Sequence, residues 1–179
     1  MKRILFISLL VFVLVSGGVF ANAVTGAQYN EPGQINLTGV VGLSGWGLSV
    51  GVGAERIMGD LDFIPEFPME WGLSARGIFS FYLLAGYTGI DYGAAPLATL
   101  HKGFNFGNNL EFDFTVGLGL GLYGYSYELL GSPYSESIKL GVASFDSVSW
   151  RWKKDLWLTL EYSYVGWNSV YGIGIRKVM

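Results

Sequence analysis

Residues 109–125 read NLEFDFTVGLGLGLYGY, and this stretch decides the fold class. Every second position from Leu110 to Leu122 is a large apolar residue, while the positions between them carry two acids, a threonine and three glycines. This alternation predicts a β-strand, because successive side chains of a strand point to opposite faces. The stretch is longer than the average strand of about five to six residues, and it suits a tilted membrane-spanning strand of about 9–11 residues.

The same alternation recurs along the chain, and helical periodicity does not. The other predicted strands are residues 34–44, 46–56, 70–82, 94–106, 136–152, 156–165 and 169–179. Between them we expect a connector at 57–69, loops at 83–93 and 126–135, and tight turns at 44–45, 107–109, 153–155 and 166–168. Eight long strands with these connections predict an antiparallel up-and-down meander.

One segment departs from the pattern. Ser144 and Asp146 share the parity of the apolar residues in the strand predicted at 136–152. This predicts either a β-bulge near these residues or a strand that leaves the apolar zone early.

The composition limits the class of protein. Hydrophobic residues make up 51% of the chain and charged residues 14%, whereas a soluble domain carries about 25% charged residues. The net charge of −3 comes without a basic block, so nucleic-acid binding is not expected. Cysteine is absent, which excludes disulfides and the lipid-modified cysteine of a bacterial lipoprotein.

The N-terminus carries the features of a secretory signal peptide. Lys2 and Arg3 form a positive n-region, residues 4–15 form an apolar run, and Val19-Phe20-Ala21 supplies small residues at a cleavage site. The alternative, a membrane-anchoring helix, needs about 20 apolar residues, which is more than this run provides. We therefore predict a signal peptide at 1–21, a short N-terminal lead at 22–33 and a barrel at 34–179.

Alternation alone does not say which face of the sheet is inside. A soluble lipocalin-like barrel points its apolar residues inward, whereas a membrane barrel points them at lipid. A solvated second face should be dense in Lys, Glu and Thr, but here that face is mostly Gly, Ser and Thr with isolated charges. Small residues suit the narrow interior of an eight-stranded barrel. The sequence thus predicts an all-β fold, an eight-stranded antiparallel up-and-down transmembrane β-barrel with its apolar side chains facing lipid.

Two groups of residues follow from this orientation. Four acids and four bases lie at positions predicted to face inward. We expect them to form a paired lumen charge network unless some of them lie at strand ends in water. These residues are Glu55, Arg76, Glu111, Asp113, Lys139, Arg151, Glu161 and Arg176. Aromatic residues near strand ends on the apolar parity predict interfacial girdles at the headgroup level, although aromatics also favour strands in general. They are Trp46, Trp71, Trp150, Trp152, Tyr164 and Tyr171.

Signals for catalysis or metal binding are weak. His101 is the only histidine, and no serine follows it at the second position, where a hydrolytic pair would be sought. Glu111 and Asp113 share a face, but the balancing bases favour salt bridges over a metal site. We therefore expect no catalytic residues, no metal and no cofactor.

The combined pattern over residues 34–179 resembles the small eight-stranded outer-membrane barrels of Gram-negative-type bacteria, the OmpA, OmpX and OmpW group. The resemblance rests on the alternating strands, the predicted signal peptide and the absence of cysteine. It implies a periplasmic N-terminus, periplasmic connections at 57–69, 107–109 and 153–155, and outer loops at 44–45, 83–93, 126–135 and 166–168. It also implies assembly by the secretion and barrel-assembly machinery and outer-membrane lipid as the surrounding partner, with the protein as a monomer.

Three functions remain open at this stage. The first is a non-enzymatic, largely plugged barrel with a structural or surface-interaction role, which the balanced interior charges favour. The second is a porin-like narrow pore or conduit for small, hydrophobic solutes, which the glycine-rich interior parity favours. The third, an envelope enzyme that uses His101, has the least support.

Overall fold

A computed structural model describes residues 25–45, 47–61, 68–84, 87–106 and 110–179. The predicted signal peptide and Trp46 lie outside the described residues. The strands are β1 Thr25–Ala27, β2 Ile35–Ser44, β3 Gly47–Leu61, β4 Met69–Leu84, β5 Tyr87–Asn105, β6 Glu111–Leu129, β7 Ser132–Lys153, β8 Leu156–Val165 and β9 Asn168–Val178. Among the described residues, no helix has the length and apolarity that a membrane crossing requires.

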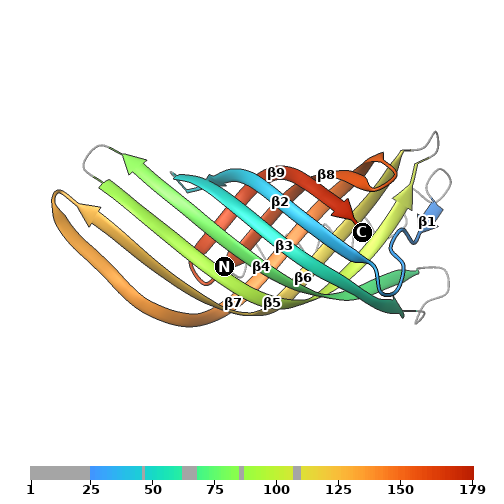
Figure 1. The fold of residues 1–179 in the computed structure, drawn as a ribbon, viewed down its shortest axis with the longest axis horizontal. Coiled ribbons are helices and arrows are strands. Elements are labelled where there is room, and N and C mark those ends of the chain that lie inside the picture. The colour runs from blue at the N-terminus through green and yellow to red at the C-terminus, as the bar shows by residue number, and fades with distance from the viewer. Residues whose placement is uncertain (1–24, 46, 62–67, 85–86, 107–109) are drawn as a thin grey trace.

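The strands form a closed antiparallel barrel (Figure 1). Strands β2 to β9 each pair with their sequence neighbours, and β2 pairs with β9 from Asn36↔Val178 to Leu43↔Tyr171 to close the ring. This confirms the predicted eight-stranded up-and-down barrel. The short strand β1 pairs with β5 beyond the point where β4 begins, with Thr25 opposite Asn105. Part of the segment predicted as a simple lead is therefore built into the sheet.

The two faces of the sheet follow the predicted parity. Leu118, Leu120 and Leu122 are 58%, 56% and 54% exposed, whereas the glycines between them point toward the interior. The inward positions of this strand require glycine, because a Cβ at Gly121 would lie 2.7 Å from Val165 Cγ1 and a Cβ at Gly117 would lie 2.5 Å from the Phe145 ring. Gly117 therefore makes room for Phe145.

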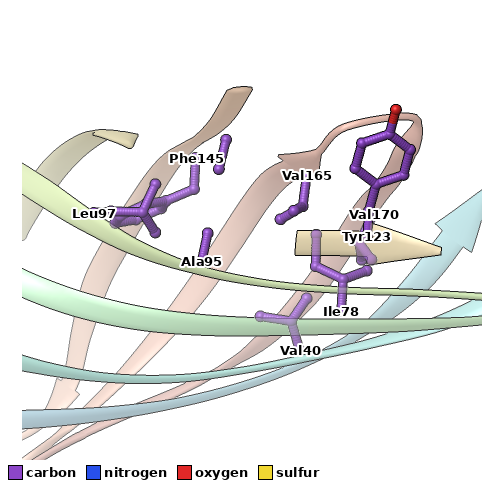
Figure 2. Packing of buried hydrophobic residues seen from close by; sticks show 9 residues of the cluster. Val40, Ile78, Ala95, Leu97, Tyr123, Phe145, Val165 and Val170 are labelled. Carbon is purple, nitrogen blue, oxygen red and sulfur yellow. The ribbon is translucent and has the colours of Figure 1, made fainter. Parts of the chain in front are cut away.

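An apolar cluster fills the middle of the barrel (Figure 2). Its side chains are 8% exposed or less and come from seven of the eight barrel strands. They are Val40, Ile78, Ala95, Leu97, Tyr123, Ala143, Phe145, Val165 and Val170.

The predicted loops at 83–93 and 126–135 are wrong. Strand β4 continues to Leu84 and β5 begins at Tyr87, while β6 continues to Leu129 and β7 begins at Ser132. The connector predicted at 57–69 is shorter than expected, because β3 reaches Leu61. Glycine, tyrosine, serine and proline suggested loops here, but each of these segments has a neighbouring strand with which to pair.

Of the two alternatives predicted near Ser144, the β-bulge is wrong. The β6–β7 ladder runs without interruption from Phe112↔Trp150 to Tyr123↔Lys139, and its irregularity lies between Tyr123 and Tyr125. Pro96 lies within β5, and the β5–β6 ladder skips its position because proline has no N–H to donate.

Candidate functional site: the barrel interior and the protruding sheet

An ion pair crosses the centre of the barrel. The Arg76 guanidinium on β4 lies 2.8 Å from Glu161 Oε2 and 3.1 Å from Glu161 Oε1 on β8. These strands lie on opposite sides of the eight-stranded ring. Both side chains are buried, and the guanidinium lies 4.0 Å from the centre of the Phe145 ring. A fixed pair at this position bridges the two walls of the lumen.

A second charged cluster lies toward the β1 end of the barrel. His101 is fully buried, with Nε2 2.9 Å from Glu55 Oε1 and Nδ1 3.0 Å from Asp113 Oδ2. Because an ionised carboxylate only accepts hydrogen bonds, both imidazole nitrogens donate and His101 carries a positive charge. Arg176 pairs with Asp113 from the far wall on β9. Two cations therefore balance two anions in this cluster.

The remaining predicted network residues are the Arg151–Glu111 pair and Lys139. Arg151 contacts Glu111 at 2.6 Å, and this pair is more exposed than the others. The Arg151 and Arg176 guanidinium groups lie 4.7 and 4.6 Å from the centre of the buried Trp157 ring. Lys139 is exposed on the outer part of β7.

Sequence reasoning missed two members of the interior network. His101 is part of the cluster in the barrel interior. Glu70 is fully buried at the start of β4. The alternation of the strands could have identified both residues. His101 lies on the same inward face of its strand as Thr99, and Glu70 lies on the same inward face of its strand as Gly72.

The segment after β1 lies across the mouth of the barrel. The backbone N–H groups of Tyr29 and Asn30 donate to Glu70 Oε1 at 2.8 and 3.1 Å. The Tyr29 hydroxyl donates to Phe104 O, and its ring lies 5.4 Å from that of Trp157 on the opposite wall. Burial, followed by the nearby carboxylate of Glu111, raises the pKa of Tyr29 to about 12. This segment therefore covers the β1 end of the lumen.

The described interfacial aromatics lie near both ends of the barrel on the outward parity. Trp71, Trp150 and Trp152 lie toward the β1 end, and Tyr164 and Tyr171 lie toward the other end. Trp152 and Tyr171 are 57% and 54% exposed. Their place at the headgroup level stays a prediction.

At the end opposite β1, the barrel wall is uneven. The β2–β3 and β8–β9 hairpins turn near residues 45 and 166, whereas the β4–β5 and β6–β7 hairpins extend further (Figure 1). We call the described outer parts of these two hairpins, residues 82–84, 87–92 and 124–142, the protruding sheet. The Tyr127 ring lies 5.4, 5.4 and 5.2 Å from the rings of Tyr87, Tyr125 and Tyr134. These ranges hold six tyrosines and three acidic residues, and Lys139 is their single lysine or arginine.

The described residues contain no group of three or more His, Asp or Glu side chains arranged to hold a metal ion. Glu55, Glu111, Asp113 and Glu161 each face a basic side chain, whereas Glu70 accepts hydrogen bonds from backbone N–H groups. The chemistry that this arrangement supports is charge neutralisation within a closed wall.

Solved structures share this architecture. The outer membrane enzyme PagL matches with a TM-score of 0.55 at 8% identity, over 80% of this chain and 98% of that chain. The chain has the fold of a small eight-stranded outer-membrane barrel. The neisserial surface protein NspA matches over 80% of this chain and 94% of the NspA chain, at 16% identity and a TM-score of 0.48. Ail, the attachment invasion locus protein of Yersinia pestis, matches over 82% and 95% of the two chains, at 13% identity and a TM-score of 0.47.

These likenesses concern the fold of the barrel and assign no activity to it. No protein-family model matches the chain, and no curated protein matches it in sequence.

Proposed function

We propose that the protein is a non-conducting outer-membrane barrel that presents its protruding sheet to molecules outside the cell. The proposal includes export by the signal peptide at 1–21 and assembly as a monomer in the outer membrane. In this orientation the β1 end faces the periplasm. The barrel anchors the protruding sheet in the membrane, and the protruding sheet contacts molecules outside the cell.

The observation that carries the closed lumen is the succession of buried and half-buried groups along its axis. From the β1 end these are Tyr29, the His101 cluster, the Arg76–Glu161 pair and the apolar cluster. Several of these contacts join opposite walls, so a solute would have to separate them in order to pass. A narrow pore or conduit, the alternative function, would require these contacts to open.

The composition of the protruding sheet supports a role in surface interaction. Tyrosine supplies large contact area at low conformational cost and is common in recognition surfaces. Its rings form a connected set around Tyr127. A barrel with a purely structural role would not need this extension.

The test is single-channel recording of the purified protein in planar bilayers, combined with membrane fractionation and heat-modifiable gel migration. We expect a folded, membrane-bound species that gives no stable conductance steps. A porin of known conductance in the same bilayers serves as the control for sensitivity. Stable conductance of the unmodified barrel would refute the closed lumen and support the pore.

A further inference from the structure

A shallow cleft of about 800 Å³ lies where the protruding sheet leaves the barrel. Most of its lining side chains have the outward parity, so it opens on the membrane-facing side rather than into the lumen. We call it the outer cleft. Its lining residues are Leu43, Gly47, Leu48, Phe81, Tyr82, Leu83, Thr88, Gly89, Ile90, Ser126, Tyr127, Glu128 and Pro133. The volume is within the range of about 300–1,000 Å³ that is usual for small-molecule sites.

The floor of the outer cleft is one cross-strand row. Leu43 is opposite Leu48, Leu48 is opposite Phe81, Phe81 is opposite Ile90, and Ile90 is opposite Ser126. The row crosses four gaps between strands of about 4.8 Å, which gives a track of roughly 19 Å. Leu43, Leu48 and Phe81 are 58%, 69% and 53% exposed. The apolar part of the track is continuous with the outward apolar face of the barrel.

The other end of the track is polar. Thr88 is directly opposite Glu128, and Ser126, two residues before Glu128 in β6, points to the same face. Glu128 is the single charged residue among the described residues that line the outer cleft. A carboxylate with two neighbouring hydroxyls attracts an ammonium group and repels a phosphate or carboxylate.

We propose that the outer cleft binds a single-chain amphiphile with an amine head. The hydrocarbon chain lies across the Leu43–Ile90 row, and the ammonium group lies against Glu128 and the hydroxyls of Thr88 and Ser126. The site requires an inserted barrel but does not require a closed lumen, so conductance measurements and binding measurements test separate claims.

The experiment uses the full barrel in phosphatidylcholine vesicles with two diazirine-bearing C12 probes, an alkylamine and the matching alkyl carboxylate. After photolysis, peptide mass spectrometry maps the crosslinks. We expect the amine probe to label peptides of β3 to β5 around Phe81 in a saturable manner, and severalfold more strongly than the carboxylate probe. Labelling spread around the barrel in proportion to exposed apolar surface would overturn the proposal, because it would show ordinary contact with surrounding lipid.

Charge reversal supplies the second arm of the experiment. Glu128→Lys should reduce labelling by the amine probe severalfold and increase labelling by the carboxylate probe. Asp155→Lys makes the same change in an exposed turn at the opposite end of the barrel and should leave both probes unaffected. Equal amine labelling in Glu128→Lys and the unmodified protein would overturn the assignment of the head group, and heat-modifiable migration verifies that each variant is folded.

Discussion

Replacement of Glu161 by Gln should destabilise the barrel by about 3–5 kcal/mol, because it leaves the Arg76 cation buried without a counter-charge. The Arg76 and Glu161 side chains are 6% and 2% exposed, and the shortest distance between their charged atoms is 2.8 Å. With an effective dielectric constant of about 20, the Coulomb energy at that distance is roughly 6 kcal/mol. The net loss is smaller than this gross attraction, because Gln still provides dipoles for the guanidinium.

The assay is a urea titration of the barrel in phosphatidylcholine vesicles, followed by tryptophan fluorescence, with heat-modifiable migration as an independent measure of the folded fraction. Glu111→Gln is the matched control, because its pair with Arg151 is partly exposed and should contribute about 1 kcal/mol or less. The double variant Arg76→Met, Glu161→Leu removes both charges and should recover most of the loss. A Glu161→Gln variant within about 1 kcal/mol of the unmodified barrel would refute the reasoning, as would a double variant that is no more stable than the single one.

Three further changes test other parts of the interior. Gly117→Val should lower the free energy of unfolding by about 1–3 kcal/mol, because the valine overpacks against Phe145. Adding Phe145→Ala to the Gly117→Val chain should recover part of that loss in the same urea titration. His101→Gln offers one donor group in place of two opposed N–H donors, so it should lower the free energy of unfolding by about 1–3 kcal/mol or more. A variant as stable as the unmodified barrel would contradict the charged cluster. The pKa of Tyr29 is about 12 in the folded state, compared with an ordinary value of 10.0, so its hydroxyl should stay neutral at a pH between these two values. Because the unfolded state loses this proton first, stability should fall as the pH rises through this interval, and Tyr29→Phe should show less of that fall in parallel alkaline titrations.

The sequence predicted the barrel because its decisive signal is local. Alternation from Leu110 to Leu122 fixes both the strand and its two faces, and the same parity identifies the inward charges. Pairing partners are not local, so the sequence could not show that Arg76 meets Glu161 across the lumen or that His101 bridges Glu55 and Asp113. Those contacts depend on which strands face one another after the sheet closes.

The ends of the strands were harder to predict than their middles. The segments around Tyr87 and Pro133 have the composition of loops, yet each continues as a strand because a neighbour satisfies its backbone groups. The outer cleft had no sequence signal, because its floor joins residues from five strands. The Tyr29 segment similarly looked like a passive lead, since its partners Glu70 and Phe104 are distant in the sequence.

The β2–β9 ladder imposes an order on folding. Every other ladder of the ring joins consecutive strands, whereas this one brings Asn36 to Val178. Loop closure over such a separation is slow compared with hairpin formation. We therefore expect the hairpins to form first and the seam between β2 and β9 to close last, so that the late intermediate is an open curved sheet with two exposed edges.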